Sequence, residues 1–308
     1  MKIGLIDVDG HNFPNLALMR ISAYHKAQGD EVEWWKGDLF YYDKVYKSKI
    51  FSDTYSQDLY DPMNCGEVIS GGTGYCISNR GGREVFDKSK NTLLPDEVDR
   101  MFPDYSIYPE YDFAVSMTSR GCPRGCPFCH VAAKEGRRSY KVADVKDFWI
   151  GQKCIEVLDP NITACADKHE LFEQYIETGA EIVFNQGLDI RLLTEKDIEY
   201  LNQMKVKNIH FAWDNPEEGL YKYFDDYAKQ THHKPHGGYG TVYVLCNFNS
   251  TMEQNLFRIY TLRDLGYDPF VMIYDKPNAP QEVKRLQRWC NNKIIFKSTR
   301  RFEEYIAI

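Results

Sequence analysis

The sequence contains no long apolar segment. No run of apolar residues approaches the roughly 20 that a helix needs to cross a bilayer. The first ten residues, MKIGLIDVDG, form a short apolar run that meets acidic residues, without the basic leader and cleavage site of an export signal. We therefore expect a cytoplasmic protein with no membrane partner.

Positive charge is also in short supply. The 308 residues include 38 Lys and Arg against 45 Asp and Glu, a net charge of −7, which disfavours a broad nucleic-acid-binding surface but allows a local basic patch. Low-complexity tracts and short repeats are absent as well. With 43% hydrophobic and 27% charged residues, the composition is that of a folded globular protein. The length suits one large domain or two modest ones.

Cysteine, in contrast, is abundant. There are nine cysteines, an odd number in a long chain with no export signal, so thiol or metal chemistry is favoured over a disulfide framework. Six of them show no metal-ligand spacing, and we expect them to be small buried hydrophobic residues: Cys65, Cys76, Cys154, Cys165, Cys246 and Cys290.

Residues 1–85 are predicted to form a small Rossmann-like α/β layer that begins with a β-α-β unit. Its predicted elements are strands over 2–8, 31–35, 43–51 and about 68–71, and a helix over 14–28. Residues 86–111 are rich in Gly, Pro and acidic residues with little periodicity, and they are predicted to be a linker.

Residues 112–308 are predicted to be a larger α/β domain with a C-terminal extension. Six strand-like runs alternate with helix-compatible segments, which predicts a parallel sheet that curls into a partial (β/α)6-type TIM barrel with its active site at the carboxyl ends of the strands. A flat, doubly wound sheet gives a similar pattern. The predicted strands cover 113–117, 154–158, 181–184, 208–213, 241–246 and 270–274, and the helices include 167–178, 194–204, 254–265 and 281–290.

One motif carries clear chemistry. The first strand of the large domain is followed by Ser119-Arg-Gly-Cys122-Pro-Arg-Gly-Cys126-Pro-Phe-Cys129-His130, a CxxxCxxC triplet. Glycine and proline keep such a loop compact and non-helical, so three thiolates within eight residues can point at one centre. Thiolates favour Fe–S clusters, Zn or Cu(I). Three ligands on a cluster of four irons would leave one iron open to a cofactor or substrate.

The motif and its position resemble the radical S-adenosylmethionine superfamily, whose hallmark is CxxxCxΦC, with Φ aromatic, after the first strand of a partial (β/α) barrel. The resemblance implies that Cys122, Cys126 and Cys129 hold a 4Fe–4S cluster and that S-adenosylmethionine chelates the fourth iron. It further implies reductive cleavage of this cofactor to a 5′-deoxyadenosyl radical that abstracts hydrogen from a substrate, with a flavodoxin- or ferredoxin-like electron donor. Phe128 occupies the aromatic position, which packs near the adenine in this family.

A structural zinc site is the alternative, in a non-catalytic binding module where His130 joins the three cysteines. Adjacent ligands such as Cys129 and His130 do not easily meet one tetrahedral ion, and zinc sites usually combine two separated ligand pairs.

Polar residues at the predicted strand ends are the next candidates. Many members of the superfamily bind the cofactor ammonium with a Gly-Gly-Glu stretch after the second strand; Asp159 stands there in this chain and is expected to replace it. Arg191 could hold a carboxylate in a bidentate fork. The alternative for each residue is turn capping or a surface ion pair. The expected cofactor contacts are Asp159, Gln186, Asp189, Arg191, Asp214 and Asn247, with Asn161, Asn185, Asn215, Asn249, Tyr274 and Asp275 beside them.

The N-terminal layer resembles the small domain of cobalamin-binding radical enzymes, in which a DxHxxG loop supplies the axial ligand. Asp9 and His11 match this motif, but Pro14 replaces its glycine, and a proline there favours a capped turn before a helix. A Gly71-Gly72 pair also echoes that fold. Cobalamin is therefore a weaker expectation than the cluster.

A basic stretch near the C-terminus could meet RNA phosphates or an acidic electron donor, although a solvated helix face is the favoured interpretation. It comprises Lys284, Arg285, Arg288, Lys293, Lys297, Arg300 and Arg301. The substrate is left open between a nucleotide or RNA base, a peptide and a small metabolite.

Overall fold

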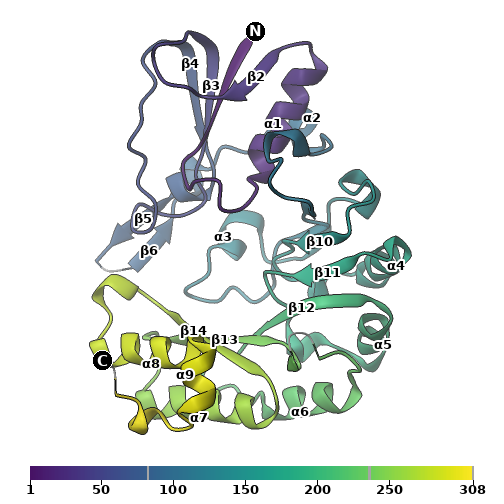
Figure 1. Ribbon diagram of the computed structural model, residues 1–308, viewed down its shortest axis with the longest axis vertical. Helices are drawn as coiled ribbons and strands as arrows, with labels where there is room; N and C mark the ends of the chain where they lie inside the picture. The colour runs from purple at the N-terminus through teal and green to yellow at the C-terminus, as the bar shows by residue number, and fades with distance from the viewer. Residues whose placement is uncertain (82, 235–236, 307–308) are drawn as a thin grey trace. The chain divides into compact units, whose positions relative to one another are not determined.

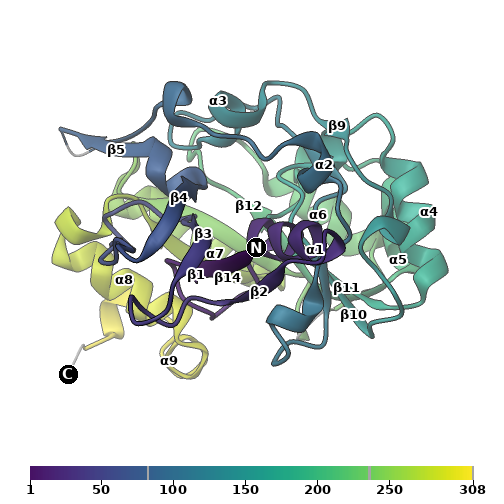
Figure 2. The ribbon, with the colours of Figure 1, turned by 90° about the horizontal axis from the view of Figure 1, so that it is seen from above.

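The computed structural model describes residues 1–81, 83–234 and 237–306 and has two parallel sheets, so this is an α/β protein (Figures 1 and 2). The chain divides into two compact units. Unit 1 comprises Met1–Met117, Gly121–Arg138 and Val142–Lys153, and unit 2 comprises Thr118–Arg120, Ser139–Lys141 and Cys154–Ile308. Among the described residues, no helix is both long and apolar enough to span a membrane.

Unit 1 contains a four-stranded parallel sheet in the order β2-β1-β3-β4. Its elements are β1 (Lys2–Asp7), α1 (Leu16–Ala27), β2 (Glu31–Trp34), β3 (Tyr42–Ser48) and β4 (Cys65–Gly71). The predicted β-α-β unit is confirmed. The Asn15 side chain caps α1 by accepting a hydrogen bond from the Leu18 amide, and the helix then buries Leu18, Met19 and Ile21.

The rest of unit 1 consists of short elements. They are η1 (Thr73–Cys76), the antiparallel pair β5 (Ile77–Arg80) and β6 (Arg83–Phe86), η2 (Lys88–Lys90), α2 (Asp96–Asp99), η3 (Tyr105–Ile107), β7 (Ala114–Ser116), α3 (Val131–Glu135) and η4 (Val145–Asp147). Within the predicted linker 86–111, ion pairs fix these turns on α1: Arg20 contacts Asp99 at 2.6 Å, and Lys26 contacts Asp104 at 2.6 Å. Contacts of this kind leave no periodic apolar pattern in the sequence.

Unit 2 contains parallel strands that pair in the order of the chain. The strands are β10 (Cys154–Val157), β11 (Glu181–Phe184), β12 (Lys205–Ala212), β13 (Thr241–Cys246) and β14 (Asp268–Ile273), and the helices are α4 (Lys168–Thr178), α5 (Glu195–Gln203), α6 (Tyr221–Gln230), α7 (Met252–Asp264), α8 (Gln281–Asn291) and α9 (Lys293–Ser298). Each strand pairs with the next one along the chain, without the reversal of order that defines a doubly wound sheet. The predicted alternation of strands and helices is confirmed.

Local sequence explains where these helices begin. Thr194 and Asp197 form a capping box at the start of α5, and Thr251 and Gln254 do the same for α7. Unit 2 also includes a two-residue antiparallel pair, β8 (Ser119–Arg120) with β9 (Tyr140–Lys141). The chain between these two short strands carries the cysteine motif.

Candidate functional site

The segment Gly121–Arg138, here named the cysteine loop, is held in a tight, mostly non-helical path. Gly121 has φ +82°, and a Cβ there would lie 2.1 Å from the Arg138 carbonyl oxygen, so only glycine fits. The Cys122 amide donates to the Gly136 carbonyl oxygen at 3.2 Å, and the Cys129 amide donates to that of Cys126 at 3.0 Å. The compact loop predicted from its glycines is confirmed.

The three motif cysteines are residues that are at least partly exposed. All nine cysteines lie in the described part of the chain and none forms a disulfide; Cys122 and Cys126 are half-buried, and Cys129 is exposed. Within the described ranges, no group of three or more His, Cys, Asp or Glu side chains is arranged to hold a single metal ion. In a 4Fe–4S cluster each thiolate binds a different iron, so three cysteines are the type of donor that such a cluster takes without a shared metal ion.

The neighbours of Cys129 face the β5–β6 pair. His130 Nε2 lies 3.8 Å from the Glu84 carboxylate, and its ring centroid lies 6.3 Å from that of Phe86. Glu84 also accepts a hydrogen bond from the Ser52 hydroxyl. Phe128 is half-buried. His130, the fourth ligand in the zinc alternative, therefore has an acidic partner outside the cysteine loop.

Asp159 anchors the residues that lead into the cysteine loop. Its carboxylate, 3% exposed, accepts hydrogen bonds from the Thr118 and Ser119 amides at 2.6 and 2.7 Å and from their hydroxyls at 2.8 and 2.6 Å. Burial raises the pKa of Asp159 to about 6, and these hydrogen bonds oppose the shift. The residue predicted to meet the cofactor ammonium thus binds the chain's own donors, which makes it a positioning residue for the loop.

Three of the predicted residues lie in one charged cluster at the carboxyl ends of β11 and β12. Arg191 donates its Nε to Asp189 at 2.7 Å and also forms an ion pair with Glu218. The positive charges of Arg191 and Arg258 both act to lower the pKa of Asp214, against the effect of burial. Arg258 itself was missed by the sequence reasoning, because a lone arginine in a helix carries no signal of burial.

Arg258 is fully buried on α7 and joins the ends of β12 and β13. Its guanidinium donates to the carbonyl oxygens of Trp213 at 2.6 Å, Asp214 at 2.9 Å and Leu245 at 3.0 Å, and to Asn255 Oδ1 at 2.6 Å. A fifth hydrogen bond reaches the Gln254 carbonyl oxygen at 3.3 Å. The arginine therefore fixes the backbone from which Asp214 projects.

The remaining strand-end candidates are dispersed along the same edge. Gln186 is exposed, and Asn185 donates to Glu156. Asn247 donates to the Tyr274 carbonyl oxygen at 2.8 Å and so ties the end of β13 to that of β14. The non-glycine residues with positive φ among those described are Asn247, Asn249 and Asp275, at 64°, 50° and 47°. Strained backbone of this kind is concentrated at functional sites.

Stability should respond to pH through Asp214. Burial raises its pKa from 3.8 to about 6, opposed by Arg258, so the folded protein holds this proton more tightly than the unfolded chain. Its stabilising contribution is complete below pH 3.8 and is lost as the pH rises through about 6. We expect the free energy of unfolding of the wild type to fall relative to that of Asp214→Asn across this window. Denaturant titrations at several pH values measure this difference, and parallel curves would contradict it.

In the N-terminal motif, Asp9 has a structural task. Its carboxylate accepts hydrogen bonds from the amides of Ile50 and Phe51, the latter at 3.3 Å. His11 is exposed, with its ring centroid 4.1 Å from that of Trp34 and 5.6 Å from that of Tyr108. These contacts are those of a turn whose histidine ring packs on aromatic residues.

The basic stretch is spread over several elements of unit 2. Lys293 pairs with Asp268 at 2.5 Å, and the Arg285 guanidinium lies 4.7 Å from the centroid of the Phe302 ring. Lys284 and Arg288 border an open groove that also contains Lys276 and Phe270. Part of the stretch therefore serves packing, and part lines a surface groove.

No model of a protein family matches the chain, and no curated protein matches it.

Proposed function

We propose that this protein is a radical S-adenosylmethionine enzyme in which Cys122, Cys126 and Cys129 hold a 4Fe–4S cluster. The observation that carries the proposal is the CxxxCxxC triplet on a tight loop whose first position, Gly121, only glycine fits, with all three cysteines at least partly exposed. When bound, such a cluster supplies the electron that cleaves S-adenosylmethionine to a 5′-deoxyadenosyl radical, which abstracts hydrogen from the substrate.

The fold of unit 2 supports the same proposal. Its parallel strands pair in chain order with a helix after each, which is the arrangement of a partial (β/α) barrel. We propose that this sheet curves into such a barrel, and that the charged cluster of Asp189, Arg191 and Asp214 at its carboxyl edge holds polar groups of the cofactor. A carboxylate of the cofactor suits Arg191, and an ammonium or ribose hydroxyls suit the acids.

Asp159 has a different part in this proposal. By accepting two amide and two hydroxyl hydrogen bonds from Thr118 and Ser119, it fixes the chain just before Cys122. It therefore positions the first thiolate rather than touching the cofactor.

The proposal includes a cytoplasmic location and a flavodoxin- or ferredoxin-like protein as electron donor. The substrate class stays open between a nucleotide or RNA, a peptide and a small metabolite. Cobalamin is not part of the proposal, because the His11 ring is packed against Trp34 and Tyr108.

The test is anaerobic reconstitution with iron and sulfide, followed by an assay of 5′-deoxyadenosine formation from S-adenosylmethionine with a strong reductant. We expect about four irons per chain in brown protein, and 5′-deoxyadenosine as a product. In Cys126→Ser, both the iron and the product should be lost. Cys65→Ser is the matched control, because Cys65 is also a half-buried thiol but lies outside the cysteine loop.

Other outcomes have clear meanings. About one zinc per chain in colourless protein would support the zinc-stabilised binding module instead. A fully loaded cluster that forms no 5′-deoxyadenosine would overturn the enzyme proposal. Normal iron content in Cys126→Ser would remove the assignment of the ligands.

A further inference from the structure

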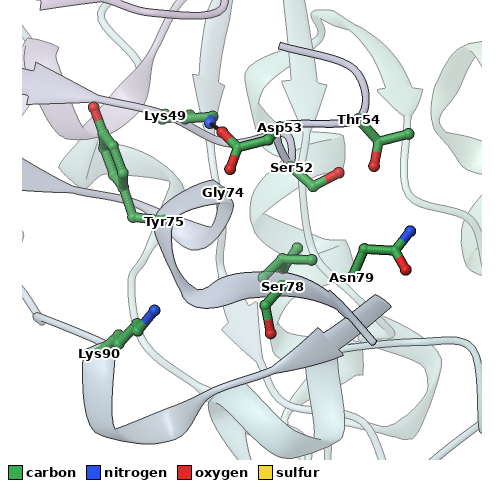
Figure 3. A pocket seen from close by; sticks show the side chains of 10 residues that line it. Lys49, Ser52, Asp53, Thr54, Gly74, Tyr75, Ser78, Asn79 and Lys90 are labelled. Atoms are coloured by element: carbon green, nitrogen blue, oxygen red, sulfur yellow. Dashed lines mark hydrogen bonds and ion pairs between the residues drawn. The ribbon is translucent and has the colours of Figure 1, made fainter. Parts of the chain in front are cut away.

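Unit 1 contains a polar cavity of about 310 Å³ at the carboxyl edge of its sheet (Figure 3). Lys49, which directly follows β3, lines it together with Gly74 and Tyr75 of η1, which follows β4. The pocket therefore lies outside the carboxyl ends of β3 and β4, the edge at which parallel α/β sheets bind ligands. We name this cavity the Lys49 pocket.

A buried ammonium is the main feature of the pocket. The Lys49 side chain is 1% exposed, its Nζ forms an ion pair with Asp53, and it lies 5.4 Å from the centroid of the Tyr75 ring. Figure 3 shows the Lys49 and Asp53 side chains pointing toward one another. A buried ammonium requires an anionic or strongly polar partner. The Asp53 side chain, however, is 79% exposed, so this partner sits in solvent and can be exchanged.

Lys47, two residues before Lys49, forms a buried ion pair in the same unit and serves as a comparison. Its side chain is 5% exposed and pairs at 2.7 Å with Asp58, which is itself only 18% exposed. Tyr75 donates its hydroxyl to the same Asp58 at 2.6 Å. Asp58 is thus fixed from two sides, whereas the carboxylate facing Lys49 stands largely in water.

The rest of the lining is suited to an anion that carries hydroxyl groups. Besides Lys49, a second lysine, Lys90, comes from η2, so two lysines and one acidic residue, Asp53, line the pocket. The side chains of Thr54, Ser78 and Asn79 add hydroxyl and amide groups, and Ser52 also lines the pocket while its hydroxyl donates to Glu84. The volume is at the low end for ligand sites, which favours a small molecule over a dinucleotide or a corrinoid.

The backbone around the pocket is fixed in advance. The Lys49 amide donates to the Gly71 carbonyl oxygen at 3.0 Å, and the Gly74 amide donates to that of Lys49 at 2.9 Å. A Cβ at Gly74 would lie 2.1 Å from the Phe51 carbonyl oxygen, so the two segments are in direct contact. Asp9 holds the same loop from the other side through the amides of Ile50 and Phe51. Binding would therefore require little reorganisation of the main chain.

We propose that the Lys49 pocket binds a small molecule through an oxyanion, a phosphate or a carboxylate, which replaces Asp53 as the partner of Lys49. Lys90 contributes the second positive charge. No residue of the cysteine motif lines the pocket, and the proposal does not rest on the proposed enzyme activity.

The experiment is isothermal titration calorimetry of the intact protein without a cluster, using inorganic phosphate, ribose 5-phosphate and malonate as probes. The order of the affinities of the three probes distinguishes a phosphate ligand from a carboxylate ligand. Lys49→Gln is expected to weaken the best probe by about tenfold or more, since a charge-assisted hydrogen bond is lost. Asp53→Asn is expected to increase the affinity for the same probe several-fold, because the competing carboxylate is removed while the size of the side chain is kept.

Two further variants keep the proposal falsifiable if Lys49→Gln does not fold. Lys90→Gln changes an exposed side chain and should weaken binding about threefold or more. Lys44→Gln is the matched control, because Lys44 lies on β3 but pairs with Glu67 at 3.2 Å and does not line the pocket. The proposal is overturned if no probe binds the wild type, if Lys44→Gln weakens binding as much as Lys90→Gln does, or if Asp53→Asn fails to tighten it.

Discussion

Replacement of Arg258 by glutamine is expected to lower the free energy of unfolding by about 4 kcal/mol. The guanidinium is fully buried and donates five hydrogen bonds, four of them to main-chain carbonyl oxygens. Glutamine has two donors and a shorter side chain, so buried carbonyl oxygens of Trp213 and Leu245 would lose their partners. Each such loss costs about 1–3 kcal/mol.

Denaturant unfolding measures this change, and Arg100→Gln is the control. The Arg100 side chain is 81% exposed and contacts Asp96 at 3.5 Å, so its replacement should change stability by less than about 0.5 kcal/mol. Equal stability of the two variants would show that water can donate hydrogen bonds to the carbonyl oxygens that Arg258 otherwise satisfies.

Asp159→Asn should have the second large effect, a loss of about 3 kcal/mol together with poorer retention of iron by the cysteine loop. One carboxylate oxygen accepts the Thr118 amide and the other accepts the Ser119 amide. An asparagine has a single acceptor oxygen, so its NH₂ group would face one of these amide donors. The path of the chain just before Cys122 should then loosen.

Two measurements are needed for this variant: denaturant unfolding and iron content after reconstitution. Asp264→Asn is the control, since the Asp264 side chain is 73% exposed and its replacement should leave both values unchanged. Unchanged stability and full iron in Asp159→Asn would show that the hydrogen bonds of its carboxylate do not position the loop. Lower stability with full iron would restrict Asp159 to the fold.

The alternation of strands and helices was readable from the sequence because each element carries its own local signal. Buried strands such as β13 are apolar runs, and Thr194 and Thr251 mark helix starts through capping boxes. The turns within 86–111 were not readable. They depend on ion pairs such as Arg20 with Asp99, whose partners lie 79 residues apart.

The candidate site divides in the same way. The three cysteines of the motif could be identified from their spacing in the sequence. The need for a tight turn at Gly121 follows from its place in the same loop. The contacts of Asp159, Arg258 and Lys49 join residues from separate elements, so no local pattern reveals that these side chains are buried. Asp9 is a clear case, because its hydrogen-bond partners are 41 and 42 residues away in the chain. The motif around Asp9 and His11 gave no sign of these two main-chain hydrogen bonds.

The path of the chain through the two units limits how recombination can exchange one unit for another. The chain passes from one unit to the other five times, after Met117, Arg120, Arg138, Lys141 and Lys153. A gene fragment that ends at residue 117 lacks the cysteine loop, and one that begins at residue 154 lacks the β8–β9 pair and the donors that Asp159 binds. No single recombination point can therefore exchange one unit for a foreign counterpart.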